Sequence, residues 1–326
     1  MPKLNTFAAI HQAIAEELER DARVIMFGEG VATKRADLVQ AFGNRVRNTP
    51  LAEAIIAGTA AGAAATGLRP VIDLLFAPFM TYSMDAIVNS AGKLRYMSGG
   101  QFAFPMVAMA MTGSGWTVGA QHNHNNEAWF VHSPGLKVVM PSSPADFKGL
   151  LKAAIRDENP VLFFVDMALT HVEGEVPEGD HVVPLGKAAL LRQGRDVTLI
   201  SYAKTVHTCL DAAAKLAEQG ISAEVIDLRS LKPLDEATIL ASVRKTGRVV
   251  VVHEASRLCG VGAEVAALIS EHAVDALRAP VKRITGPDVP APSSYVLEQA
   301  FTPQAPAIVE AVCELAARTK REVVTA

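Results

Sequence analysis

Glu53 stands at the start of an apolar helix that the sequence predicts directly after Thr49-Pro50. Proline suits the first turn of a helix, because its missing N–H would have no intrahelical partner there. A carboxylate in that position either interacts with the helix dipole or is held in a dry site for chemistry. The Ala-rich residues that follow, with Gly58 and Gly62 on one face, predict an interior helix whose backbone approaches another element closely.

A second group with chemical potential is His122-Asn123-His124, in a glycine-rich loop after a predicted strand. In parallel α/β sheets, ligands bind at that end of the strands. The imidazoles of His122 and His124 could share a metal ion, but the sequence offers no third or fourth ligand near them at a typical spacing. Imidazole titrates near neutral pH, so one histidine could act as a general acid or base, or it could simply hold the loop in place by hydrogen bonds.

Other motifs carry weaker signals. Cys259-Gly260-Val261-Gly262 resembles part of a dinucleotide-binding turn, but it lacks the full glycine spacing and favours tight helix packing instead. The sequence contains neither a P-loop nor the G-x-S-x-G elbow of hydrolases. Phe76, Phe79 and Tyr82 suit a hydrophobic core, although an aromatic ring at a sheet edge could also stack on a flat heterocycle.

Helices and strands alternate along the chain, which predicts an α/β protein with parallel or mixed sheets. In the first part, strands are expected at 24–27, 70–75, 105–111, 137–140 and 161–165, and helices at 6–20, 81–96 and 144–156. In the second part, strands are expected at 197–201, 223–227 and 248–252, and helices at 205–219, 235–245, 262–272 and 305–317. The predicted domains are 1–175 and 196–326, joined by a Gly- and Pro-containing linker at 176–195.

Composition narrows the classes of partner. The 326 residues are 50% hydrophobic with a net charge of -3, which suits two buried cores and gives no field for nucleic acid or an anionic membrane. Three dispersed cysteines imply neither a disulfide framework nor a zinc site, and residues 1–5 lack the apolar core of a signal peptide. We therefore expect a cytoplasmic protein whose partners are small molecules and other proteins.

The chain resembles the β subunit of the thiamine-diphosphate-dependent E1 component of 2-oxo acid dehydrogenase complexes, over nearly its whole length. The matching segments are Gly28-Glu29, Thr49-Pro50-Leu51-Ala52-Glu53, Val88-Asn89-Ser90-Ala91-Gly92-Lys93, Tyr96-Met97-Ser98-Gly99-Gly100-Gln101, Gln121-His122, His132-Ser133-Pro134-Gly135-Leu136-Lys137-Val138-Val139 and Lys148-Gly149-Leu150-Leu151-Lys152-Ala153-Ala154-Ile155-Arg156-Asp157. The resemblance implies a pyrimidine-binding domain followed by a transketolase C-terminal-like domain.

The resemblance also implies roles for individual residues. Glu53 would hydrogen-bond N1′ of the aminopyrimidine and favour its imino tautomer, and Phe79 would pack on that ring. Glu29 and Leu51 would also contact the cofactor. His122 would orient the lipoyl group or transfer protons. Read this way, Gly58 and Gly62 mark a helix packed against a neighbour, across a subunit interface.

A potassium ion, held mostly by backbone carbonyls in some members of the family, would lie at one further set of positions. These are Met106, Ala154, Ile155, Asp157 and Asn159.

The sequence lacks the motifs with which the family binds the diphosphate half of the cofactor. The family binds the diphosphate and its Mg²⁺ through Gly-Asp-Gly and a later asparagine, but here Gly179-Asp180-His181 is the nearest approach and no asparagine follows Asn159. The resemblance therefore implies an α subunit that supplies this half, an α2β2 heterotetramer, and a lipoylated E2 acyltransferase that receives the acyl group.

The chain also departs from the family pattern. The segment after Gly30 omits the usual G-G-V-F insertion, and His122-Asn123-His124-Asn125-Asn126 replaces the common H-S-Q-S. The first departure shortens a loop near the active-site entrance, and the second leaves open the partner of His122.

The small carbonyl substrate is indicated by other segments. Three segments together look most like acetoin dehydrogenase: Gly113-Ser114-Gly115-Trp116, Gly174-Glu175-Val176-Pro177-Glu178 and Pro184-Leu185-Gly186-Lys187-Ala188. By contrast, Tyr96-Met97-Ser98-Gly99-Gly100 looks more like pyruvate dehydrogenase. We expect acetoin, with pyruvate or a branched 2-oxo acid as the alternative. Two alternative functions of other classes remain open: a non-catalytic subunit that only assembles with a partner, and a self-sufficient NAD-dependent or metal-dependent enzyme.

Overall fold

The computed structural model describes residues 1–322, and the chain divides into two compact units. The first unit comprises Met1–Leu185 together with Ser230–Pro233, and the second comprises Gly186–Arg229 and the chain from Leu234 onward. The division falls inside the stretch 176–195, which was expected to be a linker, and strand β9 (Ala189–Arg192) lies within that stretch. Residues 323–326 of the expected second domain lie outside the described residues.

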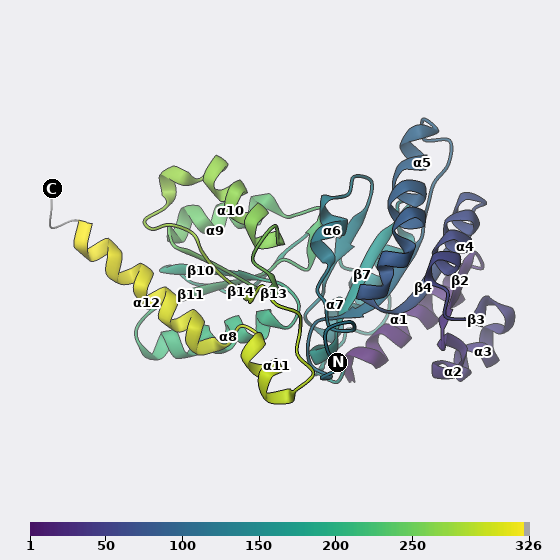
Figure 1. Cartoon of the computed structure of the whole chain (residues 1–326), viewed down its shortest axis with the longest axis horizontal. Coiled ribbons are helices and arrows are strands. Elements are labelled where there is room, and N and C mark those ends of the chain that lie inside the picture. The colour runs from purple at the N-terminus through teal and green to yellow at the C-terminus, as the bar shows by residue number, and fades with distance from the viewer. Residues whose placement is uncertain (323–326) are drawn as a thin grey trace. The chain divides into compact units, whose positions relative to one another are not determined.

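A largely parallel sheet forms the centre of the first unit, in the order β12-β6-β7-β5-β4-β2-β3 (Figure 1). Within residues 1–322, the pairing of β12 with β6 is the one antiparallel pair of this sheet, and its other strand pairs are parallel. Its strands are β2 (Val24–Glu29), β3 (Val46–Thr49), β4 (Arg69–Phe76), β5 (Val107–Thr112), β6 (Lys137–Val139), β7 (Val161–Asp166) and β12 (Ser230–Lys232). A short antiparallel pair, β1 (Lys3–Asn5) and β8 (Glu173–Glu175), lies apart from this sheet.

Helices α1 (Thr6–Arg20) and α7 (Pro144–Arg156) pack together on one face of the sheet. Ile14 and Phe147 share a core with Met26 and Val71 of the strands, so the apolar stripe of each helix faces the sheet. Both helices are capped, because Asn5 Oδ1 accepts from the Ala8 N–H and the Ser143 hydroxyl accepts from the Asp146 N–H. The expected bounds of both helices are confirmed.

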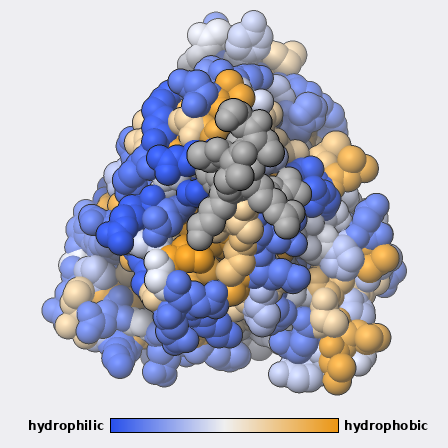
Figure 2. Space-filling model, turned by 90° about the vertical axis from the view of Figure 1, so that its left-hand side faces the viewer, coloured by the Kyte–Doolittle hydropathy of each residue, from blue (hydrophilic) through white to orange (hydrophobic). Residues whose placement is uncertain are grey.

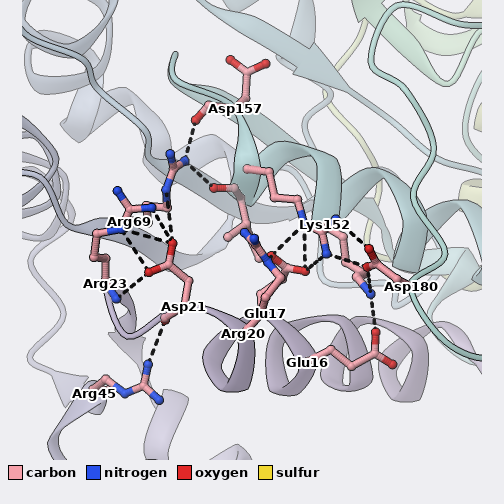
Figure 3. Close-up of polar contacts among 12 residues, drawn as sticks. Glu16, Glu17, Arg20, Asp21, Arg23, Arg45, Arg69, Lys152, Asp157 and Asp180 are labelled. Atoms are coloured by element: carbon pink, nitrogen blue, oxygen red, sulfur yellow. Dashed lines mark hydrogen bonds and ion pairs between the residues drawn. The ribbon is translucent and has the colours of Figure 1, made fainter.

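Ion pairs join α1 to α7 at the surface of this core (Figure 3). Glu16 of α1 accepts from the buried ammonium groups of Lys148 and Lys152 at 2.8 and 2.5 Å. Arg156 contacts Glu17 and Asp180, each at 2.6 Å. Buried lysines need such partners, because an unpaired ammonium group would be costly in the interior.

The segment between β4 and β5 differs from the expected helix at 81–96. A 3-10 helix, η2 (Ala77–Ser83), comes first, then a π-helix, η3 (Asp85–Ala91), and then α5 (Gly92–Met97). Pro78 explains the early start, because proline is favoured in a first helical turn. Further short elements, not expected from the sequence, are α2 (Val31–Lys34), α3 (Ala36–Phe42), α6 (Glu127–His132) and the 3-10 turns Gly43–Arg45 and Met167–Leu169.

Helix α4 (Glu53–Ala65) packs on β4 and η2, but it is not the interior helix that its composition suggests. Ile56 and Ala60 are buried, whereas Ile55 is 70% exposed. A Cβ atom added at Gly58 or Gly62 would meet nothing within 4 Å. The expectation of an interior helix is wrong for this chain alone, because apolar composition does not specify which chain covers the helix.

The second unit is built on a sheet in the order β14-β13-β10-β11-β9, which is parallel except between β9 and β11. Helices α8 and α12 share a core with one face of the sheet, and α9 and α10 lie on the other face (Figure 1). The strands are β10 (Val197–Ser201), β11 (Ala223–Asp227), β13 (Val249–Ser256) and β14 (Lys282–Gly286). The helices are α8 (Thr205–Glu218), α9 (Glu236–Thr246), α10 (Val261–His272), the 3-10 turn Val274–Ala276, α11 (Tyr295–Phe301) and α12 (Ala305–Glu322). The expectation of two α/β domains is confirmed.

Hydrophilic residues predominate on the face shown in Figure 2, where hydrophobic residues occur in separate small groups. No helix within residues 1–322 combines the length and the apolar character that crossing a bilayer requires.

Edge strand β12 is supplied by the later part of the chain. Ser230 pairs with Val139 of β6, and the Lys232 ammonium group donates to the carbonyl oxygens of Val131 and Ser133 at 2.8 and 2.7 Å. The first unit therefore contains a strand that comes after β9, β10 and β11 of the second unit in sequence.

Two glycines allow the backbone before β6 to touch the start of α5. Gly135 has φ of +83°, and a Cβ atom there would lie 1.7 Å from the carbonyl oxygen of Gly92. Two of the segments that carry the family resemblance, around Gly92 and around Gly135, are thus in direct contact.

We expect Gly135→Ala to destabilise the protein more than Gly179→Ala. Both glycines have positive φ, but a Cβ atom at Gly179 would meet nothing within 4 Å, so this control isolates the conformational cost. That cost is about 1–2 kcal/mol, and Gly135→Ala must add the displacement of the Gly92 backbone. Urea unfolding of both variants measures the difference, and equal losses of unfolding free energy would contradict the close contact.

Candidate active site

Glu53 is the first residue of α4, where β3 has ended and the chain turns back along the sheet. Its side chain is half-buried, and no side chain caps this helix end. The Ser83 hydroxyl donates to the Glu53 carbonyl oxygen at 2.8 Å, which ties η2 to the start of α4. The carboxylate therefore lies at a helix N-terminus, where negative charge is favoured.

Glu29 is the last residue of β2 and pairs in register with Thr49 of β3. Its carboxyl group is buried, and Oε1 has no hydrogen-bond partner within the described residues. Burial raises the pKa of the Glu29 carboxyl to about 7, and the neighbouring Glu53 and Asp73 carboxylates contribute to the rise. Two carboxyl groups thus lie near each other at the carboxyl end of the sheet, and one of them can hold a proton near neutral pH.

Three aromatic side chains gather at the end of β4. The His122 ring stands edge-on to Phe76 and Phe79, with ring centroids 4.8 and 5.1 Å apart. The Asn126 amide donates to the carbonyl oxygen of Ala77 at 2.8 Å, which fixes the histidine loop against η2. Because Ser83 of η2 also contacts Glu53, η2 links the carboxylate to the aromatic group.

His124 lies elsewhere. Its side chain is exposed, and its ring centroid is 5.4 Å from that of Trp129. The Thr112 hydroxyl donates a hydrogen bond to the His124 carbonyl oxygen at 3.1 Å. Across residues 1–322, no three His, Cys, Asp or Glu side chains are grouped as metal ligands. Of the two histidines, His122 is therefore the one that contacts Phe76 and Phe79.

Leu51, two residues before Glu53, has a side chain that is 78% exposed. Ile55, two residues after Glu53, is also largely exposed, so exposed apolar residues flank Glu53 in the sequence. The resemblance assigns Phe79 a role at the pyrimidine ring but gives Phe76 none. The signal available was the spacing of two phenylalanines directly after a strand.

Two of the five residues that the resemblance associates with potassium contact the guanidinium of Arg69. Its Nη1 donates to the carbonyl oxygens of Ile155 and Asp157 at 3.0 and 3.1 Å (Figure 3). Arg69 also pairs with Glu158. The Met106 carbonyl oxygen accepts from Val161 N–H at 2.9 Å, and the Asp157 carboxylate pairs with Lys137. The Asn159 amide donates to that carboxylate at 2.9 Å. The carbonyls of Ile155 and Asp157 already contact a cation of the chain.

These residues fit one half of a cofactor with a flat, hydrogen-bonding ring. Glu53 offers an acceptor, the buried Glu29 carboxyl has an oxygen without a partner, and Phe76 and Phe79 offer aromatic surface. Nothing in the group is suited to a diphosphate, because the carboxylates would repel it.

Comparison with known proteins identifies two domains in the chain. Residues 2–171 match the transketolase pyrimidine binding domain, and residues 186–308 match the transketolase C-terminal domain. A solved structure described as a split-gene transketolase, an inactive β4 tetramer, has a TM-score of 0.81 at 27% identity. The match covers 96% of this chain and 98% of that one.

Relatives of known name are similar along nearly their whole length. The β subunit of acetoin:2,6-dichlorophenolindophenol oxidoreductase from Cupriavidus necator is 44% identical, over 95% of this chain and 96% of its own. The β subunit of 2-oxoisovalerate dehydrogenase from Bacillus subtilis is 44% identical, over 97% and 99%. The β subunit of the pyruvate dehydrogenase E1 component from Porphyra purpurea is 43% identical, over 96% of both chains. The chain therefore belongs to the β subunits of the thiamine-diphosphate-dependent E1 components of 2-oxo acid dehydrogenase complexes.

Proposed function

We propose that this chain is the catalytic β subunit of an E1 enzyme that cleaves a C–C bond next to a carbonyl group and passes the acyl group to lipoyl-lysine of an E2 acyltransferase. The observation that carries the proposal is the placement of Glu53 at the N-terminus of α4, near the buried Glu29 and linked through η2 to Phe79 and His122. Thiamine diphosphate, when bound, supplies a nucleophilic carbon and an electron sink for this bond cleavage.

Each residue has a distinct task in the proposal. Glu53 accepts a hydrogen bond from the pyrimidine ring and controls its tautomer, in a site where low water content strengthens that bond. Leu51 and Phe79 pack on the ring, and Glu29 holds a proton beside Glu53. His122, held between two phenyl rings, presents an imidazole for orienting the lipoyl group or moving a proton during acyl transfer.

An α subunit supplies the other half of the site. Gly-Asp-Gly is absent from the sequence, so the diphosphate and Mg²⁺ are bound by that partner in an α2β2 assembly. The exposed apolar side of α4, with Leu51, Ile55 and the uncovered Gly58 and Gly62, supports a protein partner near Glu53. This arrangement opposes the idea of a self-sufficient NAD or metal enzyme.

Acetoin is the substrate we propose, on the strength of Gly113-Ser114-Gly115-Trp116. The relatives named for acetoin, 2-oxoisovalerate and pyruvate are 43–44% identical to this chain, so overall identity does not distinguish these substrates. Pyruvate and branched 2-oxo acids are therefore the alternatives, and a cytoplasmic location is part of the same proposal.

Glu53→Gln tests the central claim. In the reconstituted α2β2 enzyme it should lower turnover by on the order of 10²–10⁴-fold, as expected for loss of a group that controls proton transfer. Assembly and cofactor binding should be retained, because glutamine is of similar size. Turnover is measured with acetoin, pyruvate and 2-oxoisovalerate in parallel, and we expect acetoin to give the highest kcat/KM.

Glu19→Gln is the matched control, since Glu19 is an exposed carboxylate on α1. It should leave turnover unchanged. Full activity of Glu53→Gln would favour the non-catalytic assembly role instead, and activity of this chain without any partner would refute the shared site.

Glu29→Gln should change the pH dependence of stability. The folded protein holds the Glu29 proton up to about pH 7, whereas the unfolded chain releases it near the ordinary value of 4.5. Wild-type stability therefore falls as pH rises through this window, because the folded state binds more protons. Relative to wild type, the Tm of Glu29→Gln should rise between about pH 5 and pH 8, while Glu19→Gln should show no such trend in the same thermal melts.

We further propose that the Arg69 guanidinium, rather than a potassium ion, is the cation that contacts the carbonyl oxygens of Ile155 and Asp157 in this chain. The two hydrogen bonds from Nη1 support this part of the proposal, although Met106, Ala154, Ile155, Asp157 and Asn159 match a potassium set in some relatives of the family. A guanidinium can donate to several oxygens at once, so it can replace an ion that is bound mainly by carbonyls.

The Tm of the wild-type chain should accordingly be the same in KCl and NaCl of equal ionic strength. Arg69→Ala frees both carbonyls, so its Tm should be lower and should rise more in KCl than in NaCl. Arg23→Ala, which removes an exposed arginine that pairs with Asp21, serves as the control and should show no difference between the salts. Selective stabilisation of the wild type by KCl would argue for an ion site.

A further inference from the structure

A cavity of about 490 Å³ lies inside the first unit, at the carboxyl end of β4 and β5. Its lining includes Phe7 and His11 of α1, Arg35, Asp73, Met109 and Trp116. All its lining residues lie between positions 7 and 165, so it belongs to the first unit alone. Its volume is in the range typical of small-molecule sites, about 300–1,000 Å³.

Most of the lining is apolar. Aromatic surface comes from Phe7 and Trp116, whose ring centroids are 6.4 Å apart, and from Phe76. Met109, Met111 and Val165 add aliphatic and thioether surface from β5 and β7. Such a surface favours a ligand with an apolar body, because burying that body removes it from water.

The polar part of the lining is predominantly cationic. Among the side chains of residues 1–317, Arg35 forms no ion pair within 4 Å, its buried Nε has no hydrogen-bond partner, and Nη1 lies 3.4 Å from His11 Nδ1. Lys34 donates only to the Glu29 carbonyl oxygen, at 3.3 Å. Asp73 is the one carboxylate in the lining, and its Oδ1 accepts from the Leu75 N–H at 3.0 Å. Two cationic side chains against one carboxylate leave a net positive charge.

Burial lowers the pKa of Arg35, while the nearby Asp73 and Asp37 carboxylates act in the opposite direction. A ligand carboxylate could pair with Arg35 directly, because its two oxygens match the planar fork of an arginine. The cavity therefore combines an apolar interior with an anchor for an anion.

We propose that this cavity binds a small carboxylic acid with an apolar body. The carboxylate pairs with Arg35, assisted by Lys34, and the apolar body lies against Phe7, Met109 and Trp116. Glu53, Glu29 and Phe79 do not line the cavity, which borders the cofactor residues through Phe76 and Lys34, and the inference does not depend on the proposed reaction. Phe76 connects the two regions, because it lines the cavity and its ring also contacts His122.

The test uses 3-phenylpropionate as the probe and the fluorescence of Trp116 as the signal. The chain has two tryptophans, so Trp129→Phe provides a background in which Trp116 alone reports. Titration of the purified chain, and of the chain assembled with its α subunit, should give a saturable change in fluorescence. The neutral analogue 3-phenylpropionamide should bind at least 10-fold more weakly, since it lacks the charge for Arg35.

Two variants and one control separate charge from space. Arg35→Gln should weaken 3-phenylpropionate binding at least 10-fold and leave binding of the amide unchanged. Ala8→Phe, at a half-buried lining position of α1, fills part of the cavity and should abolish binding of both probes without lowering the Tm. Arg23→Gln, at an exposed arginine outside the cavity, should bind like wild type.

Several results would overturn the proposal. These are the absence of a saturable signal at millimolar probe, equal affinity for acid and amide, and unchanged affinity in Arg35→Gln. If Arg35→Gln fails to fold by circular dichroism, Ala8→Phe and the comparison of acid with amide decide the outcome. Binding by Ala8→Phe as tight as that of wild type would place the probe elsewhere and refute the site.

Discussion

Parallel pairing of β3, β2, β4 and β5 is the constraint on which the site depends. In a parallel sheet, every strand delivers its following residues to the same edge, so segments far apart in sequence meet there. Glu29 ends β2, Glu53 follows β3, Phe76 ends β4, and the histidine loop follows β5. Four separate connections thus build one constellation, and no single segment contains it.

Phe76 links two groups of residues at this edge of the sheet. One group of residues lies around α4 and η2 and suits half of a cofactor. The other lies under α1 and lines the apolar cavity. Phe76 belongs to both, since it lines the cavity and also stands edge-on to His122. A change in the position of this ring would therefore affect both groups of residues.

The elements of regular structure were largely predictable, because apolar periodicity follows from the face each element buries. Helices α1 and α7 have narrow apolar stripes and matched their expected bounds, and Thr49-Pro50 indicated the start of α4. The exposed side of α4 was not predictable, since an apolar residue looks the same whether its own chain or another covers it. The proximity of Glu29 to Glu53 arises from strand pairing, and the contacts of Arg69 involve backbone carbonyls, which leave no pattern of side chains. The cavity depends on how α1, β4 and β5 leave space between them, and periodicity carries no information about unfilled space.

Strand β12 has a consequence for how such a protein could be divided or recombined. The natural place to cut the chain, at Leu185, lies well before Ser230–Pro233, which belong to the first unit. A gene fission at that point would leave the first product without its edge strand and without the lysine that holds the carbonyls of Val131 and Ser133. The outer side of β6 would then present unpaired backbone groups, a template for association with other molecules. In this fold, modularity in sequence and modularity in space do not coincide, and recombination must carry a few residues across the apparent boundary.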